Sequence, residues 1–229
     1  MRNIKPEQRP AEEKLATQII TFVGVENGMY PYYTAKLLQA AKHDISVLIV
    51  DNSVSHDLYQ MLPSTADNNV RMLDKAVVVK DRQFTESVFK KFEVVIVYLG
   101  LCYDADYVER ATKVYYLCDY SPLSEAKLHD MELPANSRSN IIFFDKVSGK
   151  ISEKRFLSAA GEEVFADREE NVMVVGFDEG DFTVRNEWNW GFTKALRVMS
   201  KDFREAIATI VATYFGEQIK NVVKITKRI

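Results

Sequence analysis

Short, continuous apolar runs recur along the chain, separated by segments whose apolar residues have helical spacing. Such runs, bounded by turn residues, are typical of strands that helices bury on both faces. We predict strands at 19–25, 45–50, 76–79, 93–99, 113–118, 140–144 and 172–177. Six or seven strands alternating with helices predict the α/β class, as a single doubly wound, mostly parallel sheet with helices on both faces.

The helices are predicted from amphipathic spacing and from capping residues. The clearest start signal is Ser121 at a cap position, followed by Pro122 at the first helical position. Residues 192–215 carry one apolar stripe, which predicts a single long helix. Further helices are expected at 32–41, 53–62, 85–92, 104–112 and 121–131. The stretch 145–156 either forms a hairpin or leads into a short helix.

Composition favours one ordinary globular domain, predicted at 16–229 after a flexible, charged N-terminal arm at 1–15. The net charge of -3 gives no overall basic field that would attract nucleic acid. Cys102 and Cys118 lack metal or redox spacing and are expected to be buried thiols in a reducing cytosol. No apolar run approaches the roughly 20 residues that span a bilayer, and no signal-peptide core is present, so a cytoplasmic location is predicted.

The stretch 18–53 has the outline of a strand, a loop, a helix and a second, parallel strand. In this unit the helix begins at the carboxyl end of the first strand. Glycine-rich loops at that place bind phosphate through backbone N–H groups and the helix dipole. Here the loop reads GVENGMYPYYT, from Gly24 to Thr34. The loop has the position of a phosphate loop but lacks most of the residues that bind phosphate in such loops.

Together with the order of the later elements, this unit resembles the MinD/ParA family of P-loop ATPases, whose deviant Walker A loop reads K-G-G-x-G-K-T-T. The resemblance runs from Gln18 to about Gly216. Ala35 and Leu38 match the family's helix, and Asp51 matches the aspartate that ends its second strand. This register places the signature lysine at Glu26, the three glycines at Asn27, Gly28 and Tyr30, the phosphate-binding lysine at Pro31, and the two hydroxyl residues at Tyr32 and Tyr33.

These replacements remove the groups that hold a triphosphate. Pro31 supplies neither charge nor N–H, Glu26 repels polyphosphate, and Tyr30 blocks the close backbone approach that glycine permits. In the family an aspartate at the end of the central strand holds the magnesium-bound water. Tyr98 stands in its place here, and Gly100 is what remains of that turn. The resemblance therefore implies a degenerate loop with no catalytic residue, no nucleotide cofactor and no metal.

The leading hypothesis is a non-hydrolysing pseudo-ATPase that serves as a scaffold or positioning factor for a bacterial assembly, in pilus or secretion machines, conjugation or plasmid segregation. Family members dimerise across the nucleotide face, so the resemblance implies a homodimer through the loop 24–33, beside protein partners. Two alternatives stay open. One is an active ATPase of the same family that uses a displaced lysine, such as Lys36 or one from a partner subunit. The other is an unrelated receiver-like or flavodoxin-like module.

The aromatic residues near this loop have two interpretations. Tyr30, Tyr32 and Tyr33 are predicted to plug the vacated nucleotide pocket or pack in the core, with a partner surface as the alternative. For Trp188 and Trp190 core packing is preferred.

Acidic residues cluster after the last predicted strand, where α/β proteins bind ligands. A solvated acidic turn is the preferred interpretation of Asp178, Glu179 and Asp181. The resemblance places Asp178 near a residue that lies close to adenine. The three histidines are dispersed without metal-ligand spacing.

Residues 216–229 place apolar and basic side chains on opposite faces of a predicted helix. The basic residues are Lys220, Lys224, Lys227 and Arg228. Some relatives end in a basic amphipathic helix that lies on the membrane, so the resemblance implies a weak peripheral contact with the inner face of the membrane or with a partner. The segment lacks aromatic anchors, and a terminal element packed on the domain is preferred.

Overall fold

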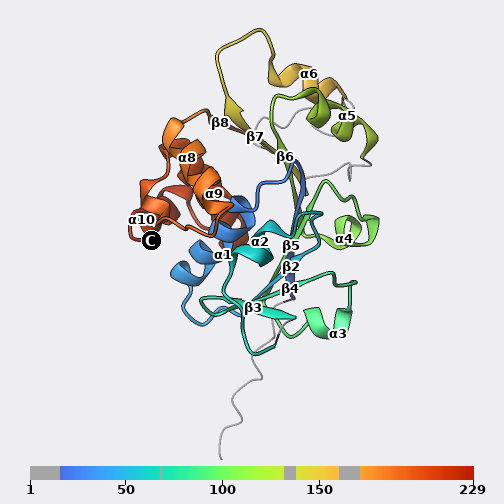
Figure 1. Cartoon of the computed structure of the whole chain (residues 1–229), viewed down its shortest axis with the longest axis vertical. Coiled ribbons are helices and arrows are strands. Elements are labelled where there is room, and N and C mark those ends of the chain that lie inside the picture. The colour runs from blue at the N-terminus through green and yellow to red at the C-terminus, as the bar shows by residue number, and fades with distance from the viewer. Residues whose placement is uncertain (1–15, 68, 132–137, 160–170) are drawn as a thin grey trace, which may run out of the picture.

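An eight-stranded sheet with strand order β3-β4-β2-β5-β1-β6-β7-β8 forms the centre of the computed structural model (Figure 1). The structure describes residues 16–67, 69–131, 138–159 and 171–229, so the predicted arm at 1–15 lies outside the described residues. Neighbouring strands are parallel apart from the antiparallel pair β3 and β4. The strands are β1 Gln18–Gly24, β2 Val47–Asp51, β3 Val70–Leu73, β4 Ala76–Lys80, β5 Val94–Gly100, β6 Lys113–Cys118, β7 Ser139–Lys146 and β8 Val172–Gly176.

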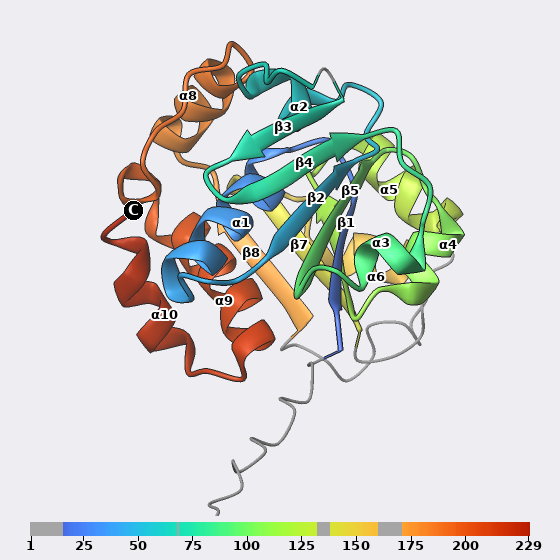
Figure 2. The same cartoon turned by 90° about the horizontal axis from the view of Figure 1, so that it is seen from below.

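Helices cover both faces of the sheet, as the continuous apolar strands require. In Figure 2, α1, α8, α9 and α10 lie on one side and α3 to α6 on the other. Their bounds are α1 Met29–Ala41, α2 Asp57–Met61, α3 Glu86–Phe89, α4 Ala105–Arg110, α5 Pro122–Asp130, α6 Glu153–Ala159, α8 Glu179–Trp188, α9 Lys201–Phe215 and α10 Ile219–Thr226, with a 3-10 turn η2 at Leu196–Val198.

Alternate residues of the central strands face two separate cores. In β1, Ile20 and Phe22 pack into the core under α1 and α9, whereas Ile19 and Val23 face the core on the side of α4 and α5. This arrangement confirms the predicted fold class. No helix of the described residues combines the length and apolarity needed to cross a membrane.

The long helix predicted at 192–215 is wrong in its first part. The helix α9 begins at Lys201, because the hydroxyl of Ser200 accepts a hydrogen bond from the N–H of Phe203 and ends the preceding turn. Asp181 fixes Ser200 by accepting from its N–H at 2.7 Å and from its hydroxyl at 2.5 Å. An apolar stripe alone did not reveal this capping interaction.

The acidic stretch after β8 is a helix start. Asp178 caps α8, since its carboxylate accepts a hydrogen bond from the N–H of Asp181 at 3.0 Å. Asp181 is buried, and burial raises the pKa of its carboxyl. The interpretation as a solvated turn is therefore wrong for Asp181, whose carboxylate joins α8 to α9.

Two predictions of burial are also wrong. Cys118 is buried, but Cys102 is exposed in the turn after β5. Trp188 is buried at 1% exposure, whereas Trp190 is 84% exposed. The helix α8 ends at Trp188, so the two tryptophans do not share a helical face.

Candidate functional site: the loops after β1, β2 and β5

The loops after β1, β2 and β5 follow the carboxyl ends of adjacent central strands. The chain leaves β1 through α1 on one face of the sheet and leaves β5 through α4 on the other. Adjacent strands with connections on opposite faces leave a crevice between their loops, where open α/β sheets bind ligands. The residues predicted from the family pattern at Gly24–Gly28, Asp51, Tyr98 and Gly100 come together at this crevice.

Gly24 makes the sharp exit from β1. Its φ of +113° is a conformation that side chains rarely adopt, and a Cβ there would lie 2.3 Å from the carbonyl oxygen of Leu117. The next N–H, of Val25, donates to that same oxygen at 2.8 Å. Gly24 thus has a structural reason to be glycine that is independent of any ligand.

Glu26 bends into the crevice. Its Oε1 accepts hydrogen bonds from the N–H of Val54 at 2.9 Å and of Ser55 at 3.4 Å, in the loop after β2. Its side chain also crosses Gly100, where a Cβ would lie 2.7 Å from Glu26 Cγ. The residue at the family's signature-lysine position is therefore a carboxylate that connects three loops.

The N-terminus of α1, which would receive a phosphate in a P-loop protein, contacts two other side chains. Asp57 Oδ2 accepts a long hydrogen bond of 3.4 Å from the N–H of Gly28. The ring of Trp188 lies over the same glycine, since a Cβ on Gly28 would meet Trp188 Cη2 at 2.4 Å and the Asp57 carboxylate at 3.0 Å. A carboxylate and an indole ring thus occupy the N-terminus of α1.

Burial and the neighbouring carboxylate of Asp51 raise the pKa of Asp57 to about 6. An unfolded Asp titrates near 3.9, so the folded chain holds this proton more tightly and loses stability as pH rises from about 4 to about 6. We expect Asp57→Asn to raise the free energy of unfolding at pH 7 by about 1 kcal/mol, because it removes a partly desolvated charge, while its single amide oxygen keeps one of the two hydrogen bonds that the carboxylate accepts, from Gly28 and Leu58.

Urea unfolding of the parent and the variant at pH 4 and pH 7 checks this expectation. The gain should be several-fold smaller at pH 4, where the carboxyl is protonated in the folded protein and about half protonated in the unfolded chain. Glu217→Gln, at an exposed position after α9, serves as the control and should change stability at neither pH. Equal stability of Asp57→Asn and the parent at pH 7 would show that the half-buried carboxylate of Asp57 is not destabilising.

Asp51, the match to the family's strand-terminal aspartate, organises the loop after β2. It is fully buried, and its oxygens accept from the N–H and hydroxyl of Ser53, the latter at 2.6 Å, and from the N–H of Tyr59 at 2.8 Å. Burial raises the pKa of this carboxyl, and His56 lies 3.9 Å away. These bonds give Asp51 a structural role.

Tyr98 occupies the strand position at which the resemblance expects an aspartate. Its side chain is fully buried, and burial together with the carboxylates of Asp57 and Glu26 raises its pKa far above the ordinary value. The phenol thus faces the carboxylates of the crevice. Within the described residues no group of three or more His, Cys, Asp and Glu side chains has an arrangement that could hold a metal ion.

The three tyrosines lie in the first turns of α1, and the prediction that they pack in the core is confirmed. All are buried, and Tyr30 contacts Phe203 of α9 with ring centroids 5.1 Å apart. The Tyr33 hydroxyl donates to the carbonyl of Lys194 at 2.8 Å. Tyr32 meets the Trp188 ring edge-on at 6.3 Å. Pro31 also lies in the first turn of α1, where its missing N–H is tolerated.

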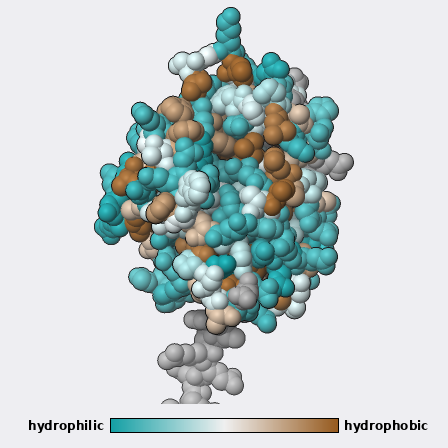
Figure 3. Space-filling model, viewed as in Figure 1, coloured by the Kyte–Doolittle hydropathy of each residue, from teal (hydrophilic) through white to brown (hydrophobic). Residues whose placement is uncertain are grey.

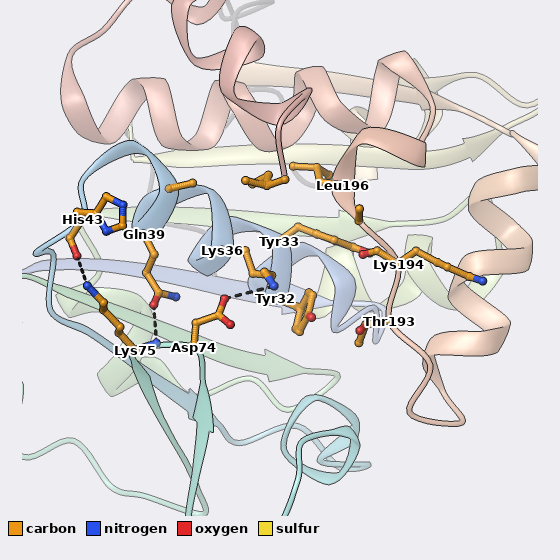
Figure 4. Close-up of a pocket in the computed structure, with 13 residues that line it drawn as sticks. Tyr32, Tyr33, Lys36, Gln39, His43, Asp74, Lys75, Thr193, Lys194 and Leu196 are labelled. Atoms are coloured by element: carbon orange, nitrogen blue, oxygen red, sulfur yellow. Dashed lines mark hydrogen bonds and ion pairs between the residues drawn. The ribbon is translucent and has the colours of Figure 1, made fainter.

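Lys36, the displaced lysine of the ATPase alternative, lies in a different cavity. It is two turns along α1, and its Nζ is 3.2 Å from Asp74 Oδ2. Figure 4 shows both side chains on the wall of a cavity of about 530 Å³, with Lys75 and Lys194 nearby. Lys36 therefore points away from the N-terminus of α1.

The C-terminal segment forms α10 and packs on the domain. Val222 and Thr226 are buried, and Val223, Ile225 and Ile229 pack against the core shared with α1 and α9. The basic residues Lys220, Lys224, Lys227 and Arg228 are exposed. The apolar stripe is therefore used inside the domain, and the basic face is left to solvent.

Two residues of the site, Asp57 and Trp188, were not predicted to lie at this crevice, and for Trp188 core packing was preferred. Asp57 opens the short helix α2, and an acidic residue in a first helical turn is ordinary. Trp188 comes from a helix far along the chain. The sequence does not indicate which residues Trp188 contacts, and the helix that carries it was not predicted.

Solved structures with the same fold are P-loop ATPases. An ATP complex of McdA from Cyanothece superposes with a TM-score of 0.57 at 13% identity, covering 89% of this chain and 98% of that chain. A ParA family ATPase from Chlorobium tepidum gives 0.55 at 14% identity, with 92% and 98% covered. The cell division protein MinD from Aquifex aeolicus gives 0.54 at 13%, with 88% and 98% covered.

No protein-family model matches the sequence, and no curated protein matches it either. The structures nevertheless define the class: the chain has the P-loop NTPase-like α/β fold. Within that class its fold is that of the ParA, MinD and McdA ATPases, over nearly the whole chain.

Proposed function

We propose that this protein is a ParA/MinD-like scaffold or positioning factor of a bacterial assembly that acts without binding ATP. The observation that supports it best is the N-terminus of α1, where the Asp57 carboxylate accepts from Gly28 and the Trp188 ring covers that glycine. A helix N-terminus attracts an anion, and here the chain supplies its own.

The charges of the crevice support the same proposal. Glu26, Asp51 and Asp57 are close enough to influence one another, and the carboxylates of Asp51 and Glu26 both raise the pKa of Asp57. Among the basic groups nearby, His56 lies 3.9 Å from Asp51 and 3.0 Å from Asp81, and Lys80, the neighbour of Asp51 in the sheet, lies over the ring of Tyr59. A triphosphate entering this crevice would meet the like charge of these carboxylates.

Isothermal titration with ATP and Mg²⁺ tests this function. We expect no heat of binding beyond the heat of dilution. We also expect ATP to leave the melting temperature unchanged, because a ligand that binds only the folded state would raise the melting temperature. A MinD-type ATPase titrated in parallel is the positive control. A saturable isotherm would contradict the proposal, and its loss in Lys36→Ala would favour the active ATPase with a displaced lysine.

We propose the kind of assembly in which this chain acts, one formed with protein partners. The MinD of Aquifex aeolicus has been solved in a complex with MinC, so a protein of this fold holds a protein partner. By that analogy we propose protein partners for this chain, a cytoplasmic location and, through the exposed basic face of α10, weak contact with the inner face of the membrane.

A further inference from the structure

A groove of about 750 Å³ lies beside the crevice, between the loop after β1, α2 and the turn after α8. We call it the Trp190 groove. Glu26 and Asp57 supply its charged lining, and Gln60, Asn189 and Trp190 are among its other walls. Among the described residues that line it, none is a lysine, an arginine or a histidine. The groove therefore combines two carboxylates with an exposed indole ring.

Trp190 is presented to solvent on an ordered turn. It is 84% exposed, and Phe192, at 64% exposure, shares with it a second hollow of about 360 Å³. The N–H groups of Trp190 and Phe192 both donate to the carbonyl of Glu187, and Gly191 at φ +83° closes the turn. Large aromatic residues exposed on a fixed backbone mark interaction sites, because little ordering entropy is lost when a partner binds.

Exposed apolar side chains accompany this groove at the same end of the sheet. Val54 follows β2, Phe177 follows β8, and both are exposed. Figure 3 shows apolar side chains lying among hydrophilic ones on the face turned to the viewer in Figure 1. A mixed surface of this kind suits a partner that brings both apolar groups and charge.

We propose that the Trp190 groove is the docking site for a basic segment of a partner protein, with an arginine or lysine side chain placed between the Trp190 ring and the carboxylates of Glu26 and Asp57. The proposal deepens the proposed function, on which it rests. An indole face attracts a cation, and the two carboxylates add charge complementarity. A second copy of the chain fits less well, since a twofold interface would bring the same carboxylates together.

The test uses the full chain and an oligoarginine peptide as the probe. The protein has two tryptophans, and one of them is buried, so a change in fluorescence on titration reports mainly on Trp190. Binding should weaken with added salt. Trp190→Ala should bind about fivefold more weakly in a fluorescence-independent assay such as calorimetry, as expected for loss of an exposed cation–π contact.

Position 189 gives a matched pair of charge variants. Asn189 is exposed on the groove wall, so Asn189→Lys should weaken probe binding about fivefold and Asn189→Glu should strengthen it, with little effect on folding. Asn221→Lys makes the same change of charge on α10, outside the groove, and should leave binding unchanged.

Equal weakening by Asn189→Lys and Asn221→Lys would overturn the docking site, since binding would then follow net charge alone. Sedimentation showing a dimer that Trp190→Ala dissolves would also overturn it and assign the groove to a second copy. Failure of the probe to bind overturns the docking site but not the proposed function, which the ATP titration tests separately.

Discussion

Gly24→Ala is expected to abolish folding. The substitution places a methyl group 2.3 Å from the carbonyl oxygen of Leu117, a backbone atom that cannot move unless its strand moves. It also forces alanine into a φ of +113°, which side chains rarely adopt. Relief requires the central strands β1 and β6 to separate, and the Leu117 oxygen also holds the N–H of Val25. The loss should exceed about 5 kcal/mol, which reaches the lower end of the total stability of folded domains.

Soluble yield and thermal unfolding by circular dichroism measure the effect. Gly149→Ala is the matched control, because no atom lies within 4 Å of its added Cβ, and it should behave like the parent. A Gly24→Ala protein with the parent's melting temperature would mean that the exit of β1 is not as tight as described. Gly24 precedes the glycine positions of the family's loop, so the prediction tests a purely structural role.

Much of the fold could be predicted from sequence because the central strands are buried on both faces. A strand such as 113–118 is then a continuous apolar run, and its bounds were predicted as found. The edge strand β3 was missed, since it is half-buried and includes Arg71. The start of α9 was missed because it depends on Asp181, a residue from another helix.

The site could be predicted only in part, for a related reason. The family pattern located Glu26, Gly28, Asp51 and Tyr98, which follow directly from the register of β1, α1, β2 and β5. Asp57 and Trp188, which contact the N-terminus of α1, come from elsewhere in the chain. Packing between distant segments has no local signal in the sequence. The segment EWNWGF shows this limit. Trp188 is the last residue of α8 and is buried, whereas Trp190 lies beyond the end of that helix and is exposed.

Trp188→Ala is expected to destabilise the protein by about 4 kcal/mol, because removing a fully buried indole leaves a cavity between α8 and the N-terminus of α1. Urea unfolding followed by far-ultraviolet circular dichroism measures the loss without relying on tryptophan fluorescence. Trp190→Ala removes the same side chain from an exposed position and should change stability by less than about 0.5 kcal/mol. Equal effects of the two substitutions would contradict the description of Trp188 as the buried cover of Gly28.

The same variant separates two reasons for excluding a nucleotide. If the indole ring were the only obstacle, Trp188→Ala would bind ATP. We expect that it does not, because Asp57 still accepts from the N–H of Gly28 and Glu26 still lies in the crevice, while Pro31 supplies no charge. An empty but acidic crevice remains repulsive to a triphosphate. ATP binding by Trp188→Ala and not by the parent would show that steric closure by α8, rather than charge, keeps the nucleotide out.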